Sequence, residues 1–358
     1  MSTLATLTKE QLKAILLRKN WRPEESFHLY IHGPFCPTQC TFCKHQGLNV
    51  KIGSDLYSRY YEEYLPNLIE SFADVIRSYP LQSVYFGGGT SSMMTTDIMV
   101  ETFASIPDFA GIPHKTFECN PSLMTEEKID LLGRYGFTYV SFGVQTFDPR
   151  ILAANNRPSP SVDRLSRLAR LVRDRGIVLN CDLITFIDKQ DCDDLRQLEA
   201  DLDMLASDIQ PDVITVYPET FVLRGAREAE QLMMVGSLQV ALANFESRSN
   251  GRYRISDRNK EKFFSVPAIR ERLTMDYRMF KSDLSSEGMD AVRSYNCSGG
   301  KLVPANQTTL GLGSLFGEKD PAYTYIGKDF YCAEVNQDWS PVYHVKRDET
   351  GVTRAVGD

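Results

Sequence analysis

The chain has 358 residues, of which 42% are hydrophobic and 24% charged, and its formal net charge is −7. These proportions are ordinary for a soluble globular protein with a large core, and the acidic balance argues against a general nucleic-acid surface. No run approaches the roughly 18 apolar residues of a membrane-spanning helix.

The cysteine content and the N-terminal residues indicate the cellular compartment. The chain has eight cysteines, and its first eight residues show no charged segment followed by an apolar block. The N-terminus therefore does not resemble a signal peptide, and cysteines without an export signal indicate a reducing compartment. We expect a cytoplasmic protein.

The elements begin with a leading helix over residues 8–20, where Thr8 and Gln11 have the spacing of a capping box. Strand-like and helix-like segments then alternate. The expected strands cover residues 28–32, 83–87, 115–119, 138–143, 178–184 and 212–217. The expected helices cover residues 56–78, 95–105, 125–135, 162–175, 193–207 and 228–247.

This alternation predicts parallel strands joined by right-handed helical crossovers. Each expected strand ends in cysteine-rich, glycine-rich or polar sequence, and in barrel enzymes the chemistry lies at the carboxyl ends of the strands. We therefore expect an α/β fold, a partial (β/α)6 TIM-like barrel, in preference to an open sheet. The strand-end residues are Cys36, Gly87, Glu118, Gln145, Asp182 and Glu219.

The pattern divides the chain into three parts. Residues 1–22 form the leading helix, residues 23–250 the barrel, and residues 251–358 a smaller subdomain that covers the substrate. The third part begins with a basic and aromatic segment, residues 252–281, and contains the glycine-rich residues 309–314. A basic segment suits an anionic or aromatic substrate, although a solvated charged face is the commoner use of such composition.

Three cysteines lie close together just after the first strand. Cys36, Cys40 and Cys43 have the spacing C-x3-C-x2-C. Three thiolates from one loop suit a [4Fe–4S] cluster with one iron left open, where a cofactor or substrate can bind.

Other interpretations of these cysteines remain open at this point. A zinc site usually takes four ligands in two pairs, and no second pair follows, although His32 and His45 lie nearby. A disulfide would leave one thiol over. Chance clustering is a further alternative.

A family resemblance rests on several motifs in order. Residues 30 to about 317 resemble the branch of radical S-adenosylmethionine (SAM) enzymes typified by oxygen-independent coproporphyrinogen III oxidase, with haem chaperones and class C radical SAM methyltransferases among its relatives. The matching motifs are Tyr30-Ile-His-x-Pro-Phe-Cys36, Phe42-Cys43, Tyr85-Phe-Gly-Gly-Gly-Thr90, Glu118-x-Asn-Pro121, Ser141-Phe-Gly-Val-Gln-Thr-Phe147 and Asp182-Leu-Ile184.

The resemblance implies two cofactors. Cys36, Cys40 and Cys43 would hold a [4Fe–4S] cluster, whose open iron would chelate SAM. Reductive cleavage of SAM would then release a 5′-deoxyadenosyl radical. Some relatives hold two SAM molecules, so a second SAM near Leu310 to Ser314 and a structural turn there are equal alternatives.

The resemblance also implies roles for the residues around SAM. Tyr30 would lie at its methionyl end, Phe42 near the adenine, and Thr90 beside the carboxylate. Backbone groups of Gly87, Gly88 and Gly89 would reach the amino group, since glycine leaves room for close approach. Glu118 would accept hydrogen bonds from ribose or amine groups, Gln145 and Asp182 would bind the ribose, and Arg157 would bind the carboxylate through its fork of donors. Taken singly, each of these residue types is more often structural.

Departures from the family pattern narrow the expected function. Gly33 replaces an isoleucine or valine, His45 stands where the oxidase has a further cysteine, and the family's Gly-Leu-Pro turn is missing after Ile184. Glu219 and Thr220 are not typical of the branch and would face a different substrate. The oxidase activity itself is therefore not expected.

We expect a radical SAM enzyme of specialised metabolism that carries out methyl transfer or carbon–carbon bond formation on a small molecule. An electron donor such as flavodoxin or ferredoxin is implied, with no nucleic-acid or membrane partner, and no catalytic residue is assigned. The alternatives are an oxidative decarboxylase of a non-porphyrin acid, which would be an oxidoreductase, and a haem-trafficking protein. The candidate haem ligands are His28, His114, His344 and Cys297.

Overall fold

The fold is taken from a computed structural model of the whole chain. It describes residues 7–18, 25–43, 47–79, 81–187, 195–219, 228–255, 262–265, 295–298, 301–304, 306–315, 329–335 and 341–347. Within these ranges, every helix is too short or too polar to span a lipid bilayer.

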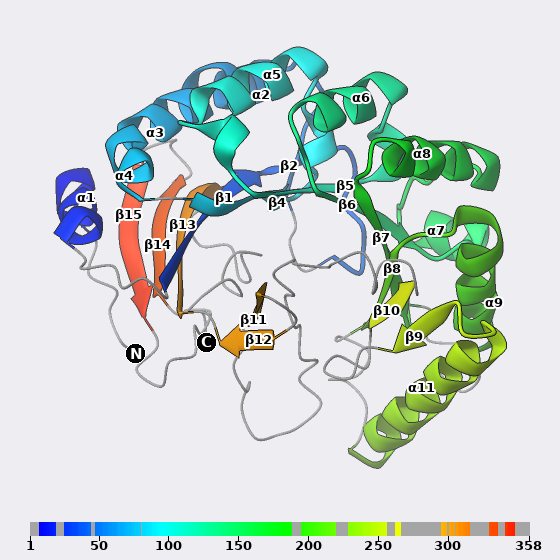
Figure 1. Cartoon of the computed structure of the whole chain (residues 1–358). Coiled ribbons are helices and arrows are strands. Elements are labelled where there is room, and N and C mark those ends of the chain that lie inside the picture. Colours follow the sequence, from blue (N-terminus) through cyan, green and yellow to red (C-terminus); the bar gives the residue numbers. More distant parts are fainter. Residues whose placement is uncertain are drawn as a thin grey trace.

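The centre of the fold is a curved sheet of eleven strands, in the order β15-β14-β13-β1-β4-β5-β6-β7-β8-β10-β9 (Figure 1). The six strands expected from the sequence are neighbours in it, and each is parallel to the next. They are β1 (Glu25–Gly33), β4 (Leu81–Gly88), β5 (His114–Cys119), β6 (Tyr139–Gln145), β7 (Val178–Thr185) and β8 (Val213–Pro218). The expected α/β partial barrel is confirmed.

Helices lie along the outer, convex side of this sheet (Figure 1). They are α1 (Lys9–Arg18), α2 (Asp55–Ser58), α3 (Leu65–Ser71), α4 (Ala73–Ser78), α5 (Thr96–Ser105), α6 (Glu126–Arg134), α7 (Pro149–Ala154), α8 (Val162–Asp174), α9 (Arg196–Met204) and α11 (Glu228–Arg248). Thr95, Thr125 and Ser161 each accept a hydrogen bond from a backbone N–H of the next helix, so these helices begin at well-formed N-caps.

The core lies between the sheet and the helices. In β5 the buried residues alternate with half-buried ones, so one side of the strand faces the helices and the other faces the inside of the curve. On the helix side, Phe86 packs against Phe103, Phe117 and Phe137, with ring centroids 5.2 to 6.0 Å apart. In β5 the half-buried residues facing the inside of the curve are His114, Thr116 and Glu118.

The helix expected over residues 56–78 is interrupted. A π-helical segment, η1 (Arg59–Tyr64), separates α2 from α3, and Phe72 leaves the helical conformation with φ −111° and ψ 9° before α4 begins. Sequence periodicity does not distinguish a π-helical turn from an α-helix. Helix α7 was not expected at all, although Asp148 before Pro149 is a typical start, with an N-cap aspartate and proline at the first position.

The segment beyond residue 250 adds strands to both edges of the sheet. Strands β13 (Asn306–Leu315) and β14 (Asp329–Val335) continue it in parallel beyond β1, and β15 (Pro341–Arg347) is antiparallel to β14. Strands β10 (Lys262–Ser265) and β9 (Tyr253–Ile255) extend the β8 edge. Leu310 to Ser314 thus lies inside a strand, so the expected alternative of a turn there is wrong.

Two short pairs of strands, β2 (Phe35–Cys36) with β3 (Leu48–Asn49) and β11 (Tyr295–Ser298) with β12 (Lys301–Pro304), lie outside the main sheet. Most of the basic segment expected over residues 252–281 lies outside the described residues. The domain boundaries near residues 22 and 250 stay predictions.

Candidate functional site

The candidate residues gather where the parallel strands end. Tyr30 of β1 is in register with Tyr85 of β4, and Gly143 of β6 is in register with Asp182 of β7. Carboxyl ends of parallel strands meet along one edge of a sheet, which is where α/β barrels place their chemistry. The predicted residues at the ends of β4, β5, β6 and β7 therefore lie along one edge of the sheet.

The cysteine loop follows β1 directly. Cys36 lies in β2, and the amide of Leu48 donates to the carbonyl of Pro34 over 2.8 Å, which folds the loop back on itself. Within the described part of the chain, Cys36, Cys40 and Cys43 are not in disulfide bonds; the first two are buried and the third is half-buried. Among the residues that the structure describes, no three His, Cys, Asp or Glu side chains are grouped so as to hold one metal ion. A cubane cluster does not need such a group, because each thiolate ligates a different iron.

The glycine-rich loop after β4 fits closely against this cysteine loop. A Cβ atom at Gly89 would lie 2.9 Å from Cys36 Sγ and 2.7 Å from the carbonyl oxygen of Phe35. The Thr90 hydroxyl donates to Cys36 Sγ over 3.5 Å. Burial raises the pKa of the Cys36 thiol, while the hydrogen bond from Thr90 opposes that rise. Free thiols and a cradle without side chains suit an iron–sulfur cluster with a ligand at its open iron.

This close approach predicts the effect of adding one methyl group. Gly89→Ala should lower the iron content per chain after anaerobic reconstitution, because the new Cβ would overlap backbone and sulfur atoms that cannot both move. Gly111→Ala is the matched control, since a Cβ there would meet nothing within 4 Å. Equal iron content in the two variants would contradict the prediction.

A second group of candidates converges on Gly87. A Cβ atom there would lie 2.9 Å from the hydroxyl of Tyr30 and 3.0 Å from Oε2 of Glu118. Tyr30 is fully buried and stacks on Tyr85, with ring centroids 5.7 Å apart. Side chains from β1, β4 and β5 therefore meet at Gly87 and leave no room there for a Cβ atom.

A third group surrounds the end of β6. Arg157 Nη2 donates to the carbonyl of Gly143 over 2.5 Å, and a Cβ at Gly143 would lie 2.7 Å from both Arg157 Nη2 and Gln145 Nε2. Arg157 Nε and Gln145 Oε1 are buried and have no hydrogen-bond partner within the described part of the chain. Such groups normally have a partner, because leaving one unpaired costs about 1–3 kcal/mol. A polar ligand at this position would supply it.

Asp182 lies in a network that the sequence analysis missed. Ser141 Oγ donates to its Oδ2 over 2.5 Å, and Asn180 Nδ2 donates to its Oδ1 over 2.8 Å. The Thr215 hydroxyl donates in turn to Asn180 Oδ1 over 2.9 Å. The network links β6, β7 and β8 and fixes the direction of the carboxylate. Asn180 and Asp182 stand two residues apart on one strand, a spacing that could have shown their shared face.

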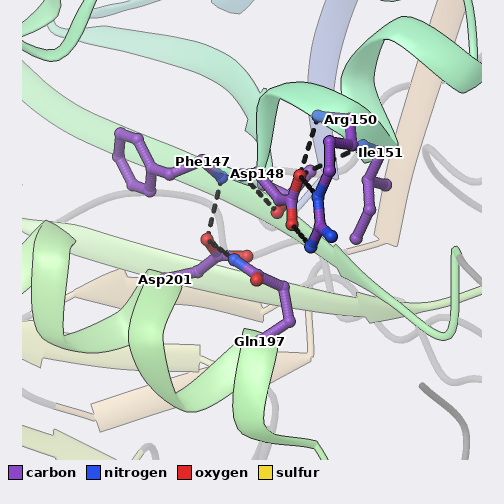
Figure 2. Close-up of polar contacts among 7 residues, drawn as sticks. Phe147, Asp148, Arg150, Ile151, Gln197 and Asp201 are labelled. Atoms are coloured by element: carbon purple, nitrogen blue, oxygen red, sulfur yellow. Dashed lines mark hydrogen bonds and ion pairs between the residues drawn. The ribbon is translucent and has the colours of Figure 1, made fainter.

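The turn between β6 and α7 is held by two carboxylates (Figure 2). Asp148 accepts hydrogen bonds from the backbone N–H groups of Arg150 and Ile151 and from the Arg150 guanidinium. Asp201 of α9 accepts from the backbone N–H of Phe147 and from Gln197, both over 2.8 Å. Burial raises the pKa of Asp201 to about 6, whereas Arg150 lowers the pKa of Asp148. This turn carries Gln145 on one side and leads to Arg157 on the other.

The raised pKa of Asp201 predicts a pH-dependent stability. The folded protein holds the Asp201 proton more tightly than the unfolded chain, so the free energy of unfolding falls as pH rises from about 4 to about 6. The span of about two pKa units corresponds to roughly 3 kcal/mol. Asp201→Asn removes this pH-dependent contribution to the free energy of unfolding. In thermal scans, the melting temperature of the variant should therefore rise relative to that of the unmodified protein as the pH is raised from 4.5 to 7. A difference that stays constant across this range would contradict the prediction.

An open cavity of about 570 Å³ lies between the cysteine loop and the turn after α7. Thr38, Gln39 and Asn49 line one side, and Ala153, Asn156 and Arg157 line the other. Phe42 is half-buried in the cysteine loop, and its contact with adenine stays a prediction. Both His45 and Thr220 lie outside the described residues.

Comparisons with known proteins agree with this geometry. The family described as the Radical SAM superfamily matches residues 30–202. The oxygen-independent coproporphyrinogen-III oxidase-like protein HemZ of Bacillus subtilis is 27% identical over 214 residues, which are 56% of this chain and 40% of HemZ. The oxygen-independent coproporphyrinogen III oxidase of Paracoccus denitrificans is 30% identical over 195 residues, 53% of this chain and 42% of the oxidase.

A solved structure shares the fold. Coproporphyrinogen III oxidase (HemN) from Escherichia coli, described as a radical SAM enzyme, superimposes with a TM-score of 0.57 at 21% identity, covering 76% of this chain and 63% of HemN. The chain spans about two fifths of the length of the two curated relatives, with 40% and 42% covered.

Proposed function

We propose that this chain, which belongs to the radical SAM superfamily, cleaves SAM reductively and uses the resulting radical on a small molecule. When bound, a [4Fe–4S] cluster supplies the electron that breaks the sulfonium bond of SAM and yields the 5′-deoxyadenosyl radical. The proposal is carried by one observation: the loop of Cys36, Cys40 and Cys43 packs through Cys36 against the glycine loop. The same end of the sheet holds buried atoms of Gln145 and Arg157 that have no hydrogen-bond partner among the described residues.

The residues of this chain would bind and orient the cofactors. Cys36, Cys40 and Cys43 would ligate three irons. The backbone of the glycine loop would contact the amino group of SAM, and Thr90 would lie beside the cluster ligand to which it already donates. Tyr30 would stand beside the methionyl end of SAM, and Phe42 would help to exclude water near the adenine.

The polar residues of the mouth would hold the rest of SAM. Arg157 would pair with the carboxylate, which gives its buried Nε a partner. Gln145 and Asp182 would bind the ribose, with Asp182 oriented by Ser141 and Asn180. Glu118 would accept hydrogen bonds from ribose or amine groups beside Gly87.

For the reaction that follows, we propose methyl transfer or carbon–carbon bond formation in specialised metabolism, with one SAM at the cluster and a second SAM as an open alternative. Oxidative decarboxylation of a non-porphyrin acid is the competing reaction. The structure gives little support to haem trafficking. His28, one candidate haem ligand, is 2% exposed and its Nδ1 lies 2.6 Å from Ser83 Oγ, so it is already enclosed.

A flavodoxin or ferredoxin would deliver the electron, which suits a cytoplasmic setting. The test is anaerobic reconstitution with iron, sulfide, reductant and SAM, followed by product analysis. Release of 5′-deoxyadenosine supports the proposal. S-adenosylhomocysteine released alongside it indicates methyl transfer, and carbon dioxide indicates decarboxylation. Reconstituted protein that binds zinc and never cleaves SAM would refute it.

A further inference from the structure

The turn after helix α7 contacts the cysteine loop and also contains Arg157. It consists of Asn155, Asn156 and Arg157, and it follows the last residue of α7, Ala154. None of the expectations from the sequence included Asn155 or its contacts. The turn matters because the cysteine loop is expected to hold the [4Fe–4S] cluster and Arg157 is expected to bind SAM.

On the side of the cysteine loop, the contacts are to Thr41 and Cys40. The amide of Thr41 donates to the carbonyl of Asn155 over 3.3 Å. The hydroxyl of Thr41 donates to Asn155 Oδ1. The thiol of Cys40 lies 3.8 Å from the carbonyl of Asn156. The loop is therefore tied to the turn immediately beside one expected cluster ligand and two residues from the next.

On the other side, the turn fixes Arg157. The amide of Arg157 donates to the carbonyl of Leu152 over 2.9 Å, and its guanidinium donates to the carbonyl of Gly143. The side-chain amide of Asn155 donates to the carbonyl of Ile151 over 2.9 Å, which holds Asn155 at the end of α7. Asn156 has φ +53°, a left-handed conformation that asparagine tolerates better than most residues. The turn is thus fixed by α7 and has little freedom to follow the loop.

We propose that Asn155 is a positioning residue that, through Thr41, couples the seating of Cys40 to the binding of SAM at Arg157. This rests on the proposed function for the identity of the two cofactors. Without its contact to Asn155, the cysteine loop would hold Cys40 less firmly in position. The iron that is expected to bind SAM would then be less well aligned with Arg157. Loss of the Thr41 hydroxyl should therefore weaken SAM binding although Thr41 itself lies on the exposed side of the loop.

Four variants distinguish the coupling between Cys40 and SAM binding from a general loss of protein stability. Thr41→Val removes the hydroxyl with little change of volume and leaves the contact between Asn155 and Ile151 in place. Thr41→Ser keeps the hydroxyl. Asn155→Asp keeps the oxygen that accepts from Thr41 but loses the donor to Ile151. Ser161→Ala removes the N-cap of the next helix, α8, and serves as a control for a lost polar contact away from the loop.

The first measurement uses the protein without cofactors. Each variant is alkylated with iodoacetamide, and the rate at each cysteine is followed by mass spectrometry. Cys40 is 8% exposed, so its rate reports how firmly the loop is seated. Thr41→Val should speed alkylation of Cys40 severalfold, while Thr41→Ser, Asn155→Asp and Ser161→Ala should not. Cys36, which the turn does not touch through any of these contacts, is the internal reference.

The second measurement uses the reconstituted protein. The dissociation constant of SAM is taken from the change that SAM causes in the electron paramagnetic resonance spectrum of the reduced cluster. Thr41→Val should raise the dissociation constant of SAM about fivefold at unchanged iron content, which corresponds to one lost hydrogen bond of ~1 kcal/mol. Thr41→Ser should restore it.

The outcomes distinguish the coupling from the proposed function. Equal SAM affinity in Thr41→Val and the unmodified protein would overturn the coupling, even if Cys40 reacted faster. An effect of the same size in Ser161→Ala would overturn it too. If the unmodified protein bound no SAM while Cys40 reactivity still followed the Thr41 hydroxyl, the proposed function would fail and the tie between Asn155 and the loop would stand.

Discussion

Replacing Cys40 with alanine should reduce the release of 5′-deoxyadenosine from SAM to background. The remaining two thiols, Cys36 and Cys43, cannot hold three irons, so the cluster and its open coordination position should both be lost. The expected loss is at least a hundredfold in the rate of SAM cleavage under anaerobic conditions with dithionite, a rough bound set by the loss of the group that does the chemistry. Iron content and the visible absorbance of the cluster should fall together.

The matched control is another buried cysteine. Cys181 of β7 is a free thiol with no exposed surface, on the helix side of the sheet and outside the cysteine loop. Cys181→Ala should cost some stability but keep the iron content and the production of 5′-deoxyadenosine. If Cys40→Ala retained activity, or if Cys181→Ala lost its iron, the assignment of the cluster to the loop would be wrong.

Replacing Arg157 with methionine should raise the dissociation constant of SAM by about a hundredfold. A buried guanidinium that pairs with a carboxylate typically contributes 2–5 kcal/mol when its partner would otherwise be left alone. Arg157 Nε is already buried without a partner among the described residues, so the position is prepared for an anion. The measurement is SAM affinity at constant iron content.

Two further variants test the reason for this effect. Arg157→Lys should recover only part of the affinity, since an ammonium group cannot form the paired contacts of a guanidinium. Arg167→Met removes an arginine whose side chain is 61% exposed and pairs with Glu126 on the surface, and it should leave SAM affinity unchanged. Full recovery by lysine would argue against a paired contact to the carboxylate.

The strands of the sheet were predictable because each is indicated by a pattern within a short stretch of sequence. Each central strand is a short run of apolar and polar residues, and β7 differs from its predicted range by a single residue at its carboxyl end. The convergence of strand ends follows from parallel topology alone, so Gly87, Glu118, Gln145 and Asp182 could be placed at one mouth without coordinates. What they bind remains a prediction.

The contacts that order the site were not predictable in the same way. Thr41 and Asn155 are 114 residues apart, and neither has a local pattern that indicates the other. Asp201 lies on α9 and accepts from a turn 54 residues earlier. Such pairs depend on how helices pack against the sheet, which periodicity does not determine. The strands past residue 305 were not predicted either: the glycine-rich residues 309–314 were expected to form a second SAM site or a turn, and no strand was assigned to β14 or β15.

The pairing of β1 with β13 has a consequence for how the protein is made. Glu25 is paired with Asn306, so the first strand of the barrel receives its outer neighbour only when most of the polypeptide has left the ribosome. Until then one side of β1 carries unpaired amide and carbonyl groups, a surface that readily joins foreign strands. A nascent chain stalled before β13 would therefore be prone to aggregation, and its survival would depend on chaperones until the late segment arrives.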